Sequence, residues 1–266
     1  MATYSDIELN INNFVATVEI QRPPYNFFDQ KLIAQIADAF DELDETSDCR
    51  AIVLASQGKA FCAGANFGTG QDDGTGSSDF TEEGFQNTTG KIYQEGVRLF
   101  RNKKPIIGAI QGAAIGGGLG LSLVPDFRIA SQEARFGANF VKLGIHQGVG
   151  ISITLPRLIG EQAANTMLYT GRRLNGEQAH AIGLVDELVT ADRLRERAVS
   201  LAEEIADNAP LAVMSVRATM RAGLADAVAQ ATEVELSEQQ WLRATEDAYE
   251  GIQAVSERRP GRFNGK

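Results

Sequence analysis

The sequence predicts an α/β protein with a β/α core over residues 1–200 and a smaller helical region over residues 201–266. Three short apolar runs of strand character are separated by segments with helical spacing: "AIVLAS", "KPIIGAIQG" and "FRIA". After "LVDELV" the strand pattern ends, and helical periodicity continues almost to the basic tail "SERRPGRFNGK". At 266 residues the chain is long enough to bury a sizeable core.

The first half opens with a predicted β-hairpin. Apolar and polar residues alternate over "IELNINNFVATVEI", and Asn12 and Asn13 between its two halves tolerate the positive φ that a tight turn needs. Asp29 is placed to cap a helix, because apolar residues recur behind it at helical spacing: Leu32, Ile33, Ile36, Phe40 and Leu43. "AIVLAS" follows as a buried strand and ends in the loop "QGKAFCAGANFG".

Further along, residues Gly68–Ser78 are rich in Gly, Asp, Ser and Thr and are expected to be mobile. A helix is expected from about Thr81 to Phe100, and long helical stretches from Leu211 to about Tyr249. The remaining expected elements are the short "ARFG", the strand-like "LVDELV", and the helices "EQAANTMLYTG", "NGEQAHAIG" and "LRERAVSLAEEIADNA".

Composition excludes several classes of function. The formal net charge of −10 argues against nucleic acid as the main partner, although a few local cations suffice for a small anion. Two cysteines, Cys49 and Cys62, indicate a reduced, intracellular protein without a disulfide framework. No signal peptide is expected in "MATYSDIELN", and no apolar run reaches membrane-spanning length. The expected location is therefore the cytoplasm.

The most unusual stretch is "QGAAIGGGLGLSLVPD", which places three consecutive glycines between an apparent strand and a helix. It is not a dinucleotide fingerprint, because Leu121 or Leu123 stands where the last glycine is needed, and no Lys-Ser or Lys-Thr follows for a P-loop. One interpretation is that small residues let the helix pack closely on the sheet. The other is that the Gly117 or Gly118 amide faces a developing negative charge at the helix N-terminus. With a second amide from "FCAGANFG" it would form an oxyanion hole, worth roughly 3–4 kcal/mol per donor.

The order of the motifs resembles the crotonase family, also called the enoyl-CoA hydratase/isomerase family, over essentially the whole chain. The resemblance is carried by "RPPYNFFD", "GKAFCAGANF", "KPIIGAIQGAAIGGGLGLSLVPDFRIAS", "ARFGANFVKLGIHQGVG", "LPRLIG", "LNGEQAHAIGLVDELV" and "ERRPGRF". It implies a crotonase-like spiral of ββα repeats with a helical C-terminal region that trimerises, as a homotrimer or as a hexamer built from two trimers.

The resemblance also implies an acyl-CoA thioester as ligand, with its carbonyl oxygen between the amides of Ala65 and Gly117. No separate cofactor is implied, because coenzyme A is part of the substrate, and no metal site is expected. The residues implied to lie near coenzyme A or the acyl group are Arg22, Tyr25, Ala63, Asn66 and Phe140. Phe263 and Lys266 are implied to reach coenzyme A from the C-terminal tail, either within one subunit or across a subunit boundary.

The sequence departs from the family where hydratases carry their two glutamates. Gly120 stands at the first position and Phe140 at the second, and Gly148 replaces an acid found in some isomerases and dehalogenases. General acid–base catalysis contributes roughly 10²–10⁴-fold per positioned group. Ordinary two-glutamate hydration is therefore not expected, whereas polarisation of the thioester is.

His146, in "KLGIHQGVG", is the first candidate for a single proton shuttle, because an imidazole titrates near neutral pH. The alternative for His146 is a loop histidine bonded to backbone. The other candidates have stronger structural interpretations: Glu82, Glu83 and Glu95 as helix-surface charges, Asp126 as a hydrogen-bonding group, Cys62 as a buried thiol and His180 as a surface residue. Asn66, where the family commonly has an aspartate, cannot act as a base.

The function expected from the sequence is thus an enzyme of the enoyl-CoA hydratase/isomerase family with isomerase-type or other enolate chemistry. Two alternatives remain open. The first is a non-catalytic acyl-CoA binder that has kept the binding pocket and lost the catalytic acids. The second is a CoA-thioester hydrolase on the same fold, which would need a base to activate water.

Overall fold

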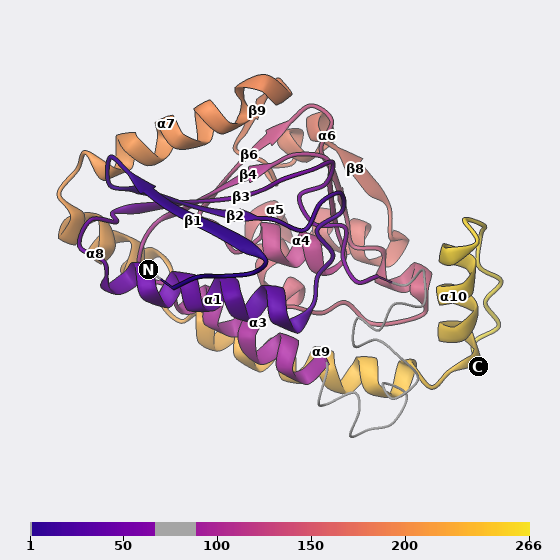
Figure 1. The fold of residues 1–266 in the computed structure, drawn as a ribbon. Helices are drawn as coiled ribbons and strands as arrows, with labels where there is room; N and C mark the ends of the chain where they lie inside the picture. Colours follow the sequence, from indigo (N-terminus) through magenta and orange to yellow (C-terminus); the bar gives the residue numbers. More distant parts are fainter. Residues whose placement is uncertain (1, 67–88) are drawn as a thin grey trace.

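A computed structural model describes residues 2–66 and 89–266, which form two sheets with helices packed on them (Figure 1). The larger sheet has six strands in the order β1-β2-β3-β4-β6-β9. β1 and β2 pair antiparallel, and every other neighbouring pair in this sheet is parallel. The strands are β1 (Ile7–Asn12), β2 (Val15–Ile20), β3 (Ala51–Ser56), β4 (Ile106–Ile110), β6 (Phe127–Ser131) and β9 (Glu187–Val189).

The smaller sheet contains β5 (Ala113–Ile115), β7 (Arg135–Gly137) and β8 (Arg173–Asn175), and a single parallel bridge joins Cys62 to Ala114 of β5. Successive turns of the chain give one strand to the larger sheet, one to the smaller sheet and then a helix. β4 and β5 lead into α4 (Gly117–Ser122); β6 and β7 lead into η3 (Asn139–Leu143) and α5 (Ile151–Thr170). The predicted spiral of ββα repeats is confirmed.

Both faces of the larger sheet are buried, which explains the nearly continuous apolar run of β3. Ile52 and Leu54 join the main core, while Ala51, Val53 and Ala55 belong to a second core beneath α7 (Leu194–Ala206). In Figure 1, α7 covers one face, and α1 (Gln30–Glu45) and α3 (Lys91–Arg101) cover the other. As predicted, Asp29 caps α1: its carboxylate accepts a hydrogen bond from Leu32 N at 2.8 Å.

The C-terminal region is helical as expected and comprises α8 (Pro210–Met220), α9 (Leu224–Leu242) and α10 (Glu246–Ser256). α9 packs against α3 and α5, and its Leu224 and Val228 enter the main core. α10 packs on η3 through Gly251, where a Cβ atom would lie 2.5 Å from the Leu143 carbonyl carbon. The boundary between residues 200 and 201 stays a prediction. The remaining short elements are α6 (Gly176–Ala181) and η4 (Ala191–Arg193).

The hairpin turn lies one residue later than predicted. Asn12 is the last residue of β1 and pairs with Val15, so the two turn residues are Asn13 and Phe14, with φ of 48° and 63°. A two-residue turn of this hand needs positive φ at both positions. Phe14 takes the second one, where its ring packs beneath the Arg50 guanidinium, whose carbon is 3.7 Å from the ring centroid.

Two other expectations differ in extent. The helix expected at "EQAANTMLYTG" is the second half of α5, which begins at Ile151 and is interrupted at Gly160 by a non-helical φ of 75°. The helix expected from Thr81 is described only from Lys91 onward. Gly68–Ser78, Glu82 and Glu83 lie outside the described residues.

Candidate functional site

Two glycine-bearing loops run side by side at the edge of the smaller sheet. The first follows β3 and the second follows β5, and short backbone hydrogen bonds join them: Cys62 N donates to Ala113 O at 2.9 Å, and Ile115 N donates to Cys62 O at 3.1 Å. The approach requires glycine. A Cβ atom at Gly118 would lie 1.9 Å from Cys62 O, and one at Gly64 would lie 2.6 Å from Ile115 O.

This packing brings Ala65 and Gly117, the two predicted amide donors, next to one another. The Cβ position of Gly64, the residue before Ala65, is 3.8 Å from Gly117 N. Ala65 and Gly117 are half-buried, although Gly64, Gly116 and Gly118 around them are buried. Within residues 2–66 and 89–266, neither the Ala65 nor the Gly117 N–H has a hydrogen-bond acceptor. Two N–H donors without acceptors therefore stand on neighbouring, partly exposed residues, as an anion site requires.

Aromatic side chains pack against this pair of loops. The Phe28 ring lies where a Gly117 side chain would be, with a ring carbon 2.9 Å from the Cβ position, and Phe28 N donates to Gly64 O at 2.9 Å. The Phe140 ring approaches the Gly116 Cβ position to 3.8 Å. Phe140 thus lies beside the glycine loop and gives it an apolar border; its contact with an acyl group stays a prediction.

The predicted binding residues Arg22, Tyr25 and Ala63 also lie together. Ala63 N donates to Tyr25 O at 3.0 Å, and the exposed Tyr25 ring is 5.6 Å from that of Phe27. The Arg22 guanidinium pairs with Asp29 at 2.5 Å and donates to Phe27 O at 3.2 Å. Asn66 is half-buried at the end of the same loop.

Asn26 organises this region and was not singled out from the sequence. It is fully buried, its Oδ1 accepts from Arg22 N at 3.0 Å, and its Nδ2 donates to Gln57 O and Ala60 O, each at 2.7 Å. These bonds tie the segment carrying Arg22 and Tyr25 to the first glycine loop. The available signal was an asparagine inside the turn "RPPYNFFD", where its φ is 49°.

Phe263 and Lys266 lie on the tail, which folds back on α10. Asp247 accepts hydrogen bonds from Asn264 N and Gly265 N at 2.7 and 2.9 Å, and its own N–H donates to Lys266 O at 3.1 Å. Both predicted side chains are exposed. In the part of this single chain that the structure describes, no hydrogen bond or ion pair joins the Phe263 or Lys266 side chain to the glycine loops. A role across a subunit boundary stays a prediction.

At Gly120 and Gly148, two of the positions where the family carries acids, side chains of other residues fill the space that an acid would need. A Cβ atom at Gly120 would lie 2.8 Å from Val149 Cβ, and one at Gly148 would lie 1.7 Å from the Tyr93 hydroxyl oxygen. Val149 takes a φ of 63°, which is unusual for a β-branched residue. α3, α4 and the loop before α5 are therefore packed so that neither glycine leaves room for an acid.

His146 lies on that loop and bonds to backbone. Its Nδ1–H donates to Gln147 O at 2.8 Å, and the His146 carbonyl accepts from Gln239 Nε2 at 2.7 Å. Across the described residues, the hydrogen bonds of His146 are with Gln147 and Gln239, and none reaches Ala65 or Gly117. The structure thus places His146 near α9 and does not bring it into direct contact with the two amides.

A buried carboxylate holds the same loop and was missed in the sequence. Glu235 of α9 is 1% exposed and accepts hydrogen bonds from Gly150 N at 2.7 Å, Ser152 N at 3.0 Å and Ser152 Oγ at 2.6 Å. Burial raises the pKa of Glu235 above its usual value, against the effect of these donors and of nearby His146. Glu235 supplies from another helix the N-terminal cap that α5 lacks locally.

The surroundings of Cys62 and Glu95, two further candidates from the sequence, favour structural roles. Cys62 is fully buried, and desolvation raises the pKa of its thiol to about 12, so it is not a nucleophile near neutral pH. Glu95 pairs with Arg98 at 2.5 Å on the surface of α3.

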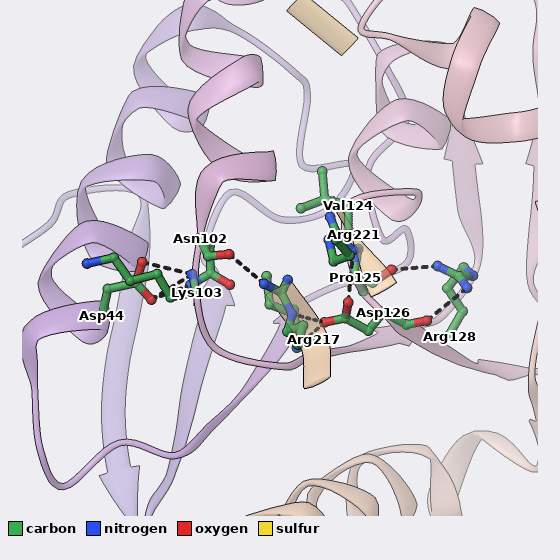
Figure 2. A network of polar contacts seen from close by, with 10 residues as sticks. Asp44, Asn102, Lys103, Val124, Pro125, Asp126, Arg128, Arg217 and Arg221 are labelled. Atoms are coloured by element: carbon green, nitrogen blue, oxygen red, sulfur yellow. Dashed lines mark hydrogen bonds and ion pairs between the residues drawn. The ribbon is translucent and has the colours of Figure 1, made fainter. Parts of the chain in front are cut away.

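Asp126 links α8 to the core, in agreement with the hydrogen-bonding role expected for it. Its carboxylate accepts from Ile106 N at 2.8 Å, Arg217 Nε at 2.8 Å and Arg221 Nη1 at 2.9 Å. Figure 2 shows Arg217 lying between Asp126 and Asn102, and Arg128 lying on the opposite side of Asp126 from Arg217. Two arginines bind its two oxygens, so Asp126 is fully engaged in structure.

The described residues contain neither a membrane-spanning helix nor a cluster of metal-binding side chains. None of their helices combines the length and apolar character needed to cross a bilayer. In the same residues, no three His, Cys, Asp or Glu side chains are grouped so that they could hold a metal ion.

Comparison with known proteins adds independent support. A family model described as enoyl-CoA hydratase/isomerase matches residues 10–266. The chain is 35% identical to the (E)-benzylidenesuccinyl-CoA hydratase of Thauera aromatica over 97% of this chain and 99% of that protein. It is 29% identical to the carnitinyl-CoA dehydratase of Salmonella typhi over 98% of each. The crystal structure of an enoyl-CoA hydratase/isomerase from Pseudoalteromonas atlantica matches with a TM-score of 0.83 at 27% identity, covering 98% of this chain and 100% of that one. The chain belongs to the enoyl-CoA hydratase/isomerase, or crotonase, family.

Proposed function

We propose that the protein is an acyl-CoA enzyme that binds the thioester oxygen between the N–H groups of Ala65 and Gly117 and performs enolate chemistry of the isomerase type. One observation carries the proposal. Backbone hydrogen bonds hold the two loops against each other, both residues are partly exposed, and neither N–H has an acceptor among the described residues.

Two N–H donors suit this chemistry because negative charge moves onto the thioester oxygen when a proton leaves the neighbouring carbon. Each donor stabilises the resulting enolate by about 3–4 kcal/mol in comparable sites. A helix N-terminus at Gly117 adds a favourable dipole. The chain thereby supplies the stabilisation that isomerisation, hydration and hydrolysis of a thioester have in common.

The packing around the missing acids favours isomerisation over hydration. Hydration needs a base that activates water, and Val149 and Tyr93 occupy the space beside Gly120 and Gly148 where a carboxylate would begin. Phe140 makes the remaining position apolar. Moving a double bond by enolate chemistry needs only removal of a proton and its return to another carbon, with water excluded.

His146 is the proposed base. Because a carbonyl oxygen only accepts, the bond to Gln147 O fixes the proton of the neutral ring on Nδ1. Nε2 then carries the lone pair that can remove a proton. Coenzyme A is proposed to bind along Arg22, Tyr25, Ala63 and Asn66, since the first three of these lie together beside the same loop.

Self-association is a further part of the proposal, as a homotrimer or hexamer in which Phe263 and Lys266 reach coenzyme A. It is supported by α8, which packs on the core mainly through polar contacts and exposes Leu211, Val216 and Met220 by 80%, 63% and 68%. Apolar side chains so exposed along one helix are typical of a protein interface.

A second candidate, a non-catalytic acyl-CoA binder, is favoured by the same lack of acids at Gly120 and Gly148. Incubation with a panel of 2-enoyl- and 3-enoyl-CoAs, followed by mass spectrometry and ultraviolet absorbance, separates the possibilities. Isomerisation keeps the mass and changes the absorbance of the conjugated thioester, hydration adds one water, and hydrolysis releases free coenzyme A. Isomerisation is the expected result; tight binding without any product contradicts the proposal and supports the binder.

A further inference from the structure

We propose that Glu235 and Ser152 are positioning residues, which hold the imidazole of His146 in the tautomer that its role as base requires. This inference rests on the proposed function. It gives a buried carboxylate of α9 a part in the reaction beyond its structural role as the cap of α5.

A chain of hydrogen bonds runs from Glu235 to the His146 ring. Glu235 Oε1 accepts from Ser152 Oγ at 2.6 Å, and Ser152 Oγ accepts from Gln147 Nε2 at 3.0 Å. Gln147 O in turn accepts from His146 Nδ1 at 2.8 Å, so Gln147 links the two ends through its side chain and its carbonyl. The four residues therefore form one network that begins at a carboxylate and ends at an imidazole.

The direction of each bond follows from the groups that make it. An ionised carboxylate only accepts, so the Ser152 hydroxyl donates its proton to Glu235 and keeps its lone pairs for the Gln147 amide. A carbonyl also only accepts, so the bond to Gln147 O keeps the proton of the neutral imidazole on Nδ1. Nε2 of His146 is left with the lone pair that a base needs.

α9 also holds the main chain on both sides of this network. Glu235 accepts from Gly150 N at 2.7 Å and Ser152 N at 3.0 Å, and Gln239, one turn further along α9, donates to His146 O at 2.7 Å. Glu235 and Gln239 are 1% and 4% exposed. Burial of two polar side chains is favourable only where they are hydrogen-bonded, and both bond to the same loop. His146 is thus held at its ring and at its carbonyl from one helix.

The same loop packs against the start of α4, which carries one of the two amide donors. Val149 Cβ is 2.8 Å from the Cβ position of Gly120 in α4, and further back in the chain the Phe140 ring is 3.8 Å from the Cβ position of Gly116. His146 lies between these two contacts in the sequence and is only half-buried. The network therefore ends on a partly accessible residue, in a segment that contacts the start of α4 on both sides of it.

A role confined to capping α5 would not need the whole network. The bonds from Gly150 N and Ser152 N to Glu235 are sufficient for the cap. The Ser152 hydroxyl and the Gln147 side chain are the parts that extend the network to His146. Removal of either should leave the cap in place and release the imidazole ring.

The test breaks the link between Ser152 and Gln147 from each side in turn. Ser152→Ala and Gln147→Ala both delete this hydrogen bond and keep the main-chain bonds of Glu235, and Ser152→Thr restores a hydroxyl. Thr166→Ala is the matched control, because it removes a hydroxyl hydrogen bond of 2.9 Å to Gln162 O in the second half of the same helix.

Nitrogen-15 NMR of the labelled histidines measures the tautomer of His146 whether or not the protein is active. The chain has two histidines, so His180→Asn assigns both sets of signals. Wild type and Thr166→Ala should carry the proton of the neutral His146 ring mainly on Nδ1, and both link variants should lose this excess.

Kinetics on the enoyl-CoA that wild type turns over provides the second readout. In both link variants kcat should fall by about 10–10²-fold with little change in KM, and Ser152→Thr should recover most of the loss. The double variant Ser152→Ala/Gln147→Ala should be no slower than either single variant, because both substitutions remove the same bond.

Link variants that keep the wild-type tautomer of His146, or that lose it and keep the wild-type kcat, overturn the positioning role alone. Losses in kcat that add up in the double variant also overturn it, because they would come from independent causes. A wild type that turns over no enoyl-CoA contradicts the proposed function itself, and the NMR comparison then still decides whether the network sets the tautomer.

Discussion

Gly120 shows how a single residue determines which side chains this site can hold. In a hydratase of the family a glutamate is expected at this position, whereas here the Cβ position is 2.8 Å from Val149 Cβ and 3.0 Å from Val149 Cγ1. Atoms at such distances must move, and the neighbour is itself held in a left-handed backbone conformation. The loss of the acid and the packing of Val149 therefore belong together.

Gly120→Glu should consequently destabilise the protein without producing hydration. Overpacking costs about 1–3 kcal/mol, and a buried, unpaired carboxylate adds to it. Urea denaturation measures the loss. The double variant Gly120→Glu/Val149→Gly is the control, because glycine both opens the space and fits the φ of 63°. If Gly120→Glu alone were as stable as wild type, the site would have to accommodate a side chain for which the structure shows no space.

Glu235 gives a prediction for pH. Burial is the largest influence on its pKa and raises it above the usual 4.5. The folded state therefore holds this proton more tightly than the unfolded chain, and the associated stability is complete at pH below the unfolded value and is lost as pH rises through the folded value.

Glu235→Gln removes this titration while keeping the size of the side chain. The free energy of unfolding of wild type, relative to this variant, should fall as pH rises above about 4.5, as measured by urea denaturation at a series of pH values. A difference that is constant with pH, or that rises, would exclude a raised pKa for Glu235.

At the scale of the element, α8 depends on one carboxylate. Arg217 is the buried residue of this helix, and Arg217 and Arg221 both bind Asp126 (Figure 2). The larger apolar side chains of α8 are exposed. The helix is thus attached to the core by ion pairs and leaves exposed apolar side chains available for another surface.

Asp126→Asn should cost about 3–5 kcal/mol, because it leaves two largely buried guanidinium groups without their counter-charge. The matched control is Glu45→Gln, which breaks the exposed 2.9 Å pair with Lys103 and should leave stability almost unchanged, because solvent screens that pair. Calorimetry measures both. Equal effects of the two substitutions would mean that Asp126 does not anchor α8.

Elements with a strong local signal were predictable, and those specified by distant partners were not. The hairpin, β3, β4 and α7 follow their hydrophobic pattern. The first half of α5 carries Ile151, Thr154 and Pro156, which are poor helix formers, and its N-terminus is capped by Glu235 about eighty residues later. β5 and β8 have three residues each, too few for a period to be read.

At the scale of the whole molecule, the site lies where three distant parts of the chain meet: the loop after β3, the start of α4, and the loop before α5 held by α9. The Ala65 and Gly117 positions were implied by the resemblance to the crotonase family, and backbone hydrogen bonds hold their two loops side by side. The places of Tyr93 and Glu235 could not be predicted, because each is defined by a contact with residues 148–152, far away in the sequence.

The most direct test of the central claim is to remove one amide proton. Gly117→Pro deletes the N–H at the first position of α4, where a proline fits the helix, and Gly117→Ala is the control because its Cβ meets the same Phe28 ring but keeps the N–H. The measurement is kcat on the enoyl-CoA that wild type turns over. The account predicts that the proline variant is about 10²–10³-fold slower than the alanine variant; equal rates in the two would contradict it.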